Sequence, residues 1–186
     1  MPIKDILLVL DSHPVPTPVS TIEKAVELSH WLDAHVTALT FALKIESPVG
    51  FYWDPLHLGG VFAEETKKSA AAASELVGAF EDLASRRNVA HAHVLVKGCP
   101  PLEVGARLVD QARLHDLTIL PHYEKSQVKP EDRVFDIGLQ TKNVEAVIFD
   151  SGRPVLLLPE QPKRELSGSA ERIVNVPTAF GRCNIE

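Results

Sequence analysis

The sequence predicts an α/β domain in which helices cover both faces of a five-stranded parallel sheet. The first apolar run, residues 6–10, is continuous rather than alternating, which is typical of a strand buried on both faces. Further along, strand-length apolar segments alternate with longer segments of helical periodicity, the pattern of parallel strands joined by right-handed crossovers. The 186 residues fit one such core, and we expect this domain to span residues 1–160.

The N-terminal part predicts two strands and the helix between them. Residues 6–10 form the first strand. Ser20 and Glu23 have the spacing of a capping box, so a helix is expected to begin there. Apolar positions three and four apart continue this helix to about Ala34, and residues 35–41 follow as the second strand.

A long loop and the longest helix come next. Residues 44–60 contain two prolines and three glycines, which predicts a loop. This loop carries the adjacent aromatic residues 51–53, which either cover the site, form a dimer contact or pack against the following helix. Residues 61–87 are alanine-rich and predict the longest helix of the chain. Its expected buried side consists of Leu76, Phe80, Leu83 and Ala84.

The third and fourth strands are expected at residues 91–97 and 117–120, with a helix between them. Residues 98–101 contain two prolines after Gly-Cys and are expected to start that helix. Its apolar stripe would be Leu102, Ala106, Val109 and Ala112.

The C-terminal part predicts one more helix and strand and then a tail. Residues 122–134 are polar and favour a loop or a frayed helix, and a helix over 136–151 leads into the fifth strand at 154–159. Residues 161–186 have the composition of a linker and tail, with an extra strand expected at 171–176. The expected inner face of the helix over 136–151 is Ile137, Val144, Val147 and Ile148.

Charge and composition argue against several classes of function. Lys and Arg number 19 against 25 Asp and Glu, a net charge of −6, which has the wrong sign for a nucleic-acid partner. The apolar runs are too short to cross a bilayer, and the N-terminus lacks the pattern of a signal peptide. Cys99 and Cys183 are too few for a disulfide framework. We therefore expect a cytoplasmic protein with neither a nucleic-acid nor a membrane partner.

Several blocks of the sequence, in order and with consistent spacing, resemble the universal stress protein family. The blocks are residues 6–12, 96–101, 106–112, 116–120 and 153–158. The resemblance spans residues 3–159 and implies a fold of the adenine nucleotide alpha hydrolase type, with strand order 3-2-1-4-5. It also implies a stress-response role and a homodimer.

That strand order would place a ligand in the crevice at the carboxyl ends of the first and fourth strands. In nucleotide-binding relatives an aspartate ends the first strand, as Asp11 does here, and a glycine-rich stretch after the fourth strand cradles the phosphates. Residues 121–135 contain no glycine, so the site is expected to be degenerate, with ATP or AMP as candidate ligands. The expected ligand-binding residues are Asp11, Ser12, His13, Thr40, Val96, Pro121, His122 and Ser151.

Two alternatives concern individual side chains. His13 and His122 could approach Asp11 to form a metal or acid–base site, or they could be solvated loop histidines. Cys99 could be an activated thiol at a helix start or an ordinary, partly buried cysteine. The Gly-x-Ser-x-Gly nucleophile motif is absent from the sequence.

Three hypotheses for function follow. The favoured one is a non-enzymatic stress-response or regulatory protein of the universal stress protein type, with a degenerate nucleotide site. The second is a binding module for an adenine nucleotide or another small molecule at the carboxyl ends of the first and fourth strands. The third is a metal-assisted hydrolase.

Overall fold

A computed structural model describes residues 2–46, 58–122 and 139–159. Several sequence-based predictions lie outside these residues: the aromatic residues 51–53, most of the polar stretch 122–134, and the tail 161–186 with its expected strand at 171–176. Among the described residues, no helix is both long and apolar enough to cross a membrane.

Five parallel strands form one sheet in the order β3-β2-β1-β4-β5, as expected. The strands are β1 (Asp5–Leu10), β2 (His35–Leu43), β3 (His91–Cys99), β4 (Leu117–His122) and β5 (Val155–Pro159). β1 is central, since Leu7 lies opposite Thr37 of β2 on one side and Thr118 of β4 on the other. The carboxyl ends of β1 and β4 therefore adjoin, where a ligand crevice is expected in this topology.

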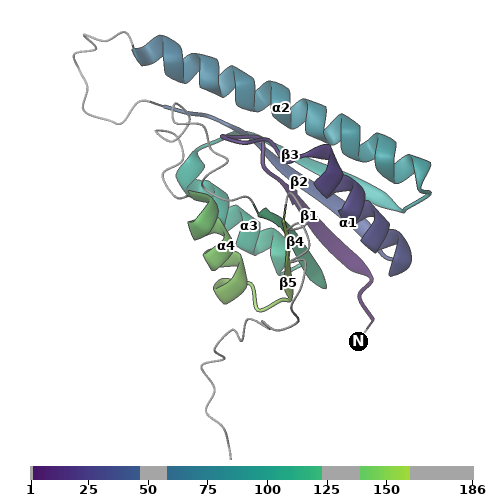
Figure 1. Cartoon of the computed structure of the whole chain (residues 1–186). Helices are drawn as coiled ribbons and strands as arrows, with labels where there is room; N and C mark the ends of the chain where they lie inside the picture. The colour runs from purple at the N-terminus through teal and green to yellow at the C-terminus, as the bar shows by residue number, and fades with distance from the viewer. Residues whose placement is uncertain (1, 47–57, 123–138, 160–186) are drawn as a thin grey trace, which may run out of the picture.

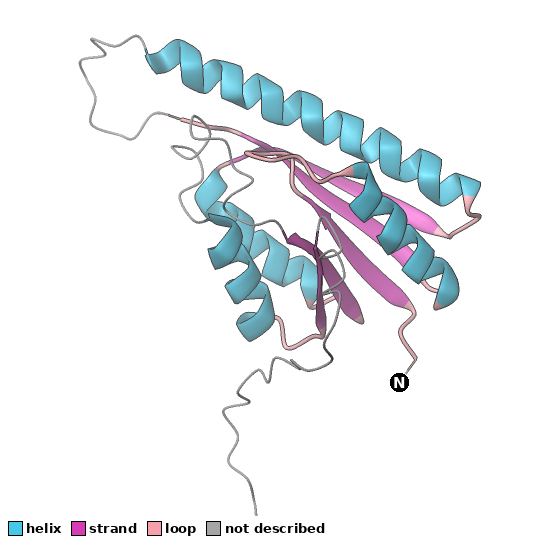
Figure 2. Ribbon diagram, in the orientation of Figure 1, coloured by secondary structure: helices cyan, strands magenta, loops and turns pink. Residues whose placement is uncertain are grey.

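Helices cover both faces of the sheet, as Figures 1 and 2 show. α1 and α2 lie on one face, and α3 and α4 on the other. The helices are α1 (Val19–Trp31), α2 (Leu58–Arg86), α3 (Val104–Ala112) and α4 (Leu139–Asp150), with a short 3-10 turn, η1 (Pro101–Glu103), before α3.

The core explains the continuous apolar run of β1. Alternate side chains point to opposite faces of a strand, so both faces of β1 must be apolar. Ile6, Leu8 and Leu10 pack on the α1 and α2 side, together with the fully buried Phe80. The side chains between them pack against α3.

The predicted capping box of α1 is wrong. The helix begins at Val19 with Pro18 as its N-cap, and no side chain caps it. Pro18 is extended, and its carbonyl accepts the first helical hydrogen bonds, so Ser20 already lies inside the helix. The helix ends at Trp31, before the expected Ala34, because the chain turns there.

The boundaries near α3 and α4 also differ from expectation. β3 continues to Cys99 and α3 begins only at Val104, so Leu102 precedes the helix and is 79% exposed. Ala106 is exposed as well, and the buried face of α3 is Val104, Leu108, Val109 and Ala112. On α4, Val147 is buried as expected, whereas its neighbour Ile148 is 42% exposed because adjacent helical positions point about 100° apart.

Candidate functional site

Asp11 follows the last residue of the central strand β1, at the edge where β1 and β4 end. Its peptide N–H donates to Thr17 Oγ1 at 2.8 Å, and its carbonyl accepts from the Thr17 N–H at 2.8 Å. The loop after β1 therefore folds back on itself and fixes the backbone of Asp11. Asp11 is only partly open to solvent, and its carboxylate has no hydrogen-bond or ion-pair partner among the described residues.

The electrostatics of Asp11 are unusual for an aspartate. Burial raises its pKa from the ordinary value of 3.8 to about 7, because removal of water disfavours the charged carboxylate. Strongly shifted carboxyl groups in clefts are a mark of functional sites. A ligand that donates hydrogen bonds to this carboxylate would replace the lost water.

The Ser12 hydroxyl is directed into the protein. Its Oγ donates to the Phe41 carbonyl of β2 at 2.6 Å and lies 2.8 Å from Ser69 Oγ of α2. The hydroxyl is therefore engaged inside the protein rather than presented to a ligand.

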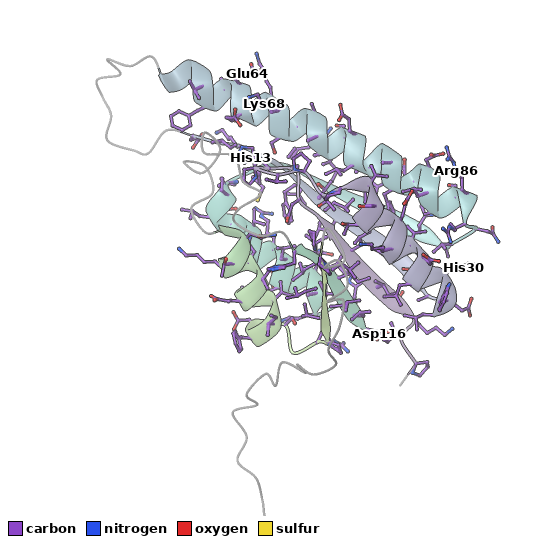
Figure 3. All side chains as sticks on the ribbon, in the orientation of Figure 1. His13, His30, Glu64, Lys68, Arg86 and Asp116 are labelled. Carbon is purple, nitrogen blue, oxygen red and sulfur yellow. The ribbon has the colours of Figure 1, made fainter. Side chains whose placement is uncertain are left out.

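His13 also faces α2. Its Nε2 lies 3.0 Å from Glu65 Oε2, and both side chains are about nine-tenths buried. Lys68 Nζ donates to the other oxygen of Glu65 at 2.7 Å and, with His13, lowers the pKa of that carboxyl. Figure 3 shows His13 beneath the part of α2 that carries Lys68.

The alternative site of His13, His122 and Asp11 is not formed. His122 is exposed at the end of β4, while His13 is paired with Glu65. Within residues 2–46, 58–122 and 139–159, no three His, Cys, Asp or Glu side chains are grouped so that they could hold a metal ion.

Two other expected residues lie in the strands on either side of β1. Pro121 is buried at the end of β4, and its carbonyl accepts from Gln140 Nε2 at 3.4 Å. Thr40 is fully buried opposite Leu10 in the sheet, and its Oγ1 has no hydrogen-bond partner among the residues that the structure describes.

The structure separates the remaining two expected residues from Asp11. Val96 lies on the edge strand β3, with β2 between it and β1, and is partly buried against the core. Ser151 lies between α4 and β5, and its Oγ accepts from the Arg153 N–H at 3.2 Å. Because α4 leads back to the start of β5, Ser151 is at the amino ends of the strands, the opposite edge from Asp11.

Sequence reasoning missed the polar residues of α2 that contact the loop after β1. Glu65 and Ser69 are 7% and 0% exposed. They continue the buried stripe of α2 through Ala73, Leu76, Phe80 and Ala84 at spacings of three and four. Extending that stripe toward the N-terminus would have found them.

A groove of about 700 Å³ lies between α3 and α4. None of the expected site residues lines it. Its apolar lining is Leu102, Ala106, Val109, Ala146 and Phe149, and charged side chains from both helices flank these residues. The two helices approach closely at Gly105, where a Cβ would lie 3.0 Å from Asn143 Oδ1.

Solved structures of universal stress proteins have a similar fold. The universal stress protein UspA from Lactobacillus plantarum matches with a TM-score of 0.56 and 16% sequence identity, over 85% of this chain and 99% of that one. The chain has the universal stress protein fold. No family model matches the sequence, and a search of curated proteins finds no match.

Other structures of universal stress proteins match with lower TM-scores. A family member from Burkholderia pseudomallei matches with a TM-score of 0.49 and 22% identity, over 84% of this chain and 96% of that one. A family protein from Arabidopsis thaliana, solved with AMP bound, matches with a TM-score of 0.48 and 14% identity, over 84% of this chain and 91% of that one.

Proposed function

We propose that this chain is a cytoplasmic, non-enzymatic regulatory protein of the universal stress protein type, acting in the stress response, which binds a small ligand at Asp11. The observation that carries the proposal is the Asp11 carboxylate at the carboxyl end of β1. It lacks a partner among the described residues, and burial raises its pKa to about 7. A poorly solvated, unpartnered carboxylate costs folding free energy, and a ligand with N–H or O–H donors would offset that cost.

The proposed ligand is the size of a nucleoside and is held through its base or sugar. Amino and hydroxyl groups are the donors that a carboxylate accepts. Residues 121–135 contain no glycine, so the sequence lacks the residues that usually let backbone N–H groups cradle a triphosphate. Phosphate groups on the ligand should therefore add little affinity.

The engagement of Ser12 and His13 supports binding rather than catalysis. A serine nucleophile needs a base within hydrogen-bond reach. Ser12 instead contacts a backbone carbonyl and another serine, and His13 contacts Glu65. A metal-assisted hydrolase would require metal retained by the purified protein, and an activity lost in His122→Ala.

Calorimetric titration of adenosine, AMP and ATP into the protein at pH 8 tests the proposal. Adenosine and AMP should bind with similar affinity, and ATP no more tightly. Asp11→Asn should weaken adenosine binding by about tenfold or more, the loss expected for a hydrogen bond to a charged group. The matched control is Asp82→Asn, which alters an exposed carboxylate paired with Arg86 on α2. Tenfold tighter binding of ATP than of adenosine, equal binding by Asp11→Asn, or no binding of any of the three by the wild type would contradict the proposal.

The affinity for the ligand should also rise with pH. A donor-bearing ligand binds the ionised carboxylate, and the pKa of Asp11 is about 7 in the free protein. Affinity should therefore rise between pH 6 and pH 8, by up to about tenfold per pH unit below 7, and then level off. Asp11→Asn should remove this dependence.

We also propose that the chain is a homodimer. Two exposed apolar side chains support this: Leu157 on the edge strand β5 is 38% exposed, and Phe149 at the end of α4 is 79% exposed. Exposed apolar side chains beside a sheet edge are typical of an interface. Light scattering should give the dimer mass for the wild type and the monomer mass for Leu157→Lys, whereas Trp31→Lys, at the end of α1, should leave the dimer intact. A monomeric wild type would contradict this proposal.

A further inference from the structure

Two buried serines link three segments of the chain through one line of hydrogen bonds. The Leu43 N–H donates to Ser69 Oγ at 2.9 Å, Ser69 Oγ lies 2.8 Å from Ser12 Oγ, and Ser12 Oγ donates to the Phe41 carbonyl at 2.6 Å. Each hydroxyl carries one hydrogen. Since the Ser12 hydrogen is directed to Phe41, Ser69 must be the donor to Ser12. The line therefore runs in one direction, from the Leu43 N–H of β2 through Ser69 of α2 and Ser12 of the loop after β1 to the Phe41 carbonyl of β2.

This line of hydrogen bonds is buried. Ser12 is 5% exposed and Ser69 is fully buried. Four residues further along the same face of α2, Ala73 is also fully buried without any polar group. A buried hydroxyl costs free energy unless it is paired. The hydroxyl of Ser69 is therefore best explained by what it holds.

What it holds is the residue directly after Asp11. Ser12 is tied to β2 and α2, and the next residue, His13, is tied to α2 through Glu65 at 3.0 Å. The bonds between Asp11 and Thr17 close the loop on itself but do not attach it to the rest of the protein. Ser12 is attached directly to β2 at the Phe41 carbonyl and to α2 at Ser69, and Ser69 in turn binds the Leu43 N–H of β2.

We propose that Ser69 is a positioning residue for the Asp11 ligand site, whose hydroxyl holds the loop after β1 so that the Asp11 carboxylate keeps a fixed and poorly hydrated position. The inference rests on the proposed function, because it assigns Ser69 a role at that same site. A binding carboxylate keeps its geometry only when its supporting contacts are themselves fixed. Without the Ser69 hydroxyl, Ser12 Oγ loses its donor and the Leu43 N–H loses its acceptor. The loop would then move and admit water to Asp11.

The test is a carboxyl carbon NMR titration of Asp11 in the wild type, in Ser69→Ala and in Ser74→Ala. Ser74 is the matched control, because it lies on the same helix with an exposed hydroxyl that bonds only its own helix, at the Ala70 carbonyl. Ser69→Ala should lower the pKa of Asp11 by about one pH unit or more toward 3.8, as water reaches the carboxylate. Ser74→Ala should leave it unchanged. An unchanged Asp11 titration in folded Ser69→Ala would overturn the proposal.

Adenosine binding provides the functional readout. Its dissociation constant should increase about tenfold in Ser69→Ala and stay unchanged in Ser74→Ala. If the wild type binds no adenosine, the proposed function fails, whereas the Asp11 titration still decides the role of Ser69 by itself.

A measurement on the wild type keeps the inference testable if Ser69→Ala does not fold. The Leu43 amide is held by Ser69, and the Asp11 amide is held by Thr17 within the loop. If the hydroxyl line holds the loop, both amides should exchange with solvent deuterium through one shared opening and show equal protection. Fast exchange at Leu43 with full protection at Asp11 would contradict the proposal.

Discussion

Replacement of Asp11 by Asn is expected to stabilise the protein, and to do so more at pH 8 than at pH 5. The Asp11 carboxylate has no partner among the described residues, and burial raises its pKa from 3.8 to about 7. Ionising this carboxyl in the folded state costs free energy that the unfolded chain does not bear. Asparagine keeps the size and shape of the side chain but carries no charge.

The expected magnitude follows from the pKa. At 1.36 kcal/mol per pKa unit, a rise from 3.8 to about 7 corresponds to about 4 kcal/mol of unfolding free energy lost above pH 7. Between these two values the folded protein binds more protons than the unfolded chain, so the contribution of Asp11 to stability falls as the pH rises. Most of this change, about 3 kcal/mol, lies between pH 5 and pH 8.

Urea unfolding of the wild type and Asp11→Asn at the two pH values measures this effect. Comparing the two proteins at each pH cancels the titration of all other groups. Asp11→Asn should gain about 3 kcal/mol more over the wild type at pH 8 than at pH 5, while Asp82→Asn should show no such change. An equal difference at both pH values, or a variant less stable than the wild type at pH 8, would refute the reasoning.

Three further predictions concern other parts of the fold. Asp116 accepts hydrogen bonds from two backbone N–H groups at the start of β1, and these bonds lower its pKa. Its stabilising effect should therefore be complete above the ordinary aspartate pKa and disappear as the pH falls through the lowered value. The Tm difference between the wild type and Asp116→Asn, measured from pH 7 to pH 2, should shrink toward zero. The Cys99 thiol is buried and burial raises its pKa, so in a variant whose other cysteine is serine it should react with Ellman's reagent far more slowly in the folded protein than in urea. Gly105→Ala should be more stabilising in an Asn143→Ala background than alone, by about 0.5 kcal/mol or more in urea unfolding, because the new Cβ would lie 3.0 Å from Asn143 Oδ1.

Each of these has a contradicting result. A Tm difference for Asp116→Asn that stays constant as the pH falls would show that the two backbone hydrogen bonds do not depend on its charge. Equal labelling rates for Cys99 in buffer and in urea would mean that the thiol is accessible and ionised. Strictly additive effects of the Gly105 and Asn143 changes would show that the two side chains do not meet.

The order of elements could be predicted from the sequence because it depends on local pattern. The unbroken run of β1 required two covered faces, and the alternation of strands with helices required parallel pairing. The start of α1 could not be placed, because Ser20 and Glu23 have the right spacing for a cap while the extended Pro18 fixes the chain two residues earlier. The stripe of α3 was misplaced because the chain turns in a 3-10 geometry over Leu102 before the helix begins.

The site was predictable only in part. The position of Asp11 followed from its place at the end of the central strand. The roles of Ser12 and His13 depend on α2, more than 50 residues further along the chain, and spacing within the loop carries no information about that helix. Ser69 lies in an alanine-rich run, where it resembles a helix-compatible filler until the fold places it against the loop.

The central claim is that Asp11 anchors a small ligand. It is tested most directly by native mass spectrometry of gently purified wild type, Asp11→Asn and Asp82→Asn, which identifies any small molecule that each protein retains. We predict that the wild type and Asp82→Asn retain the same nucleoside-sized molecule and that Asp11→Asn loses it. The same molecule retained on Asp11→Asn, or no small molecule on the wild type, would contradict the claim.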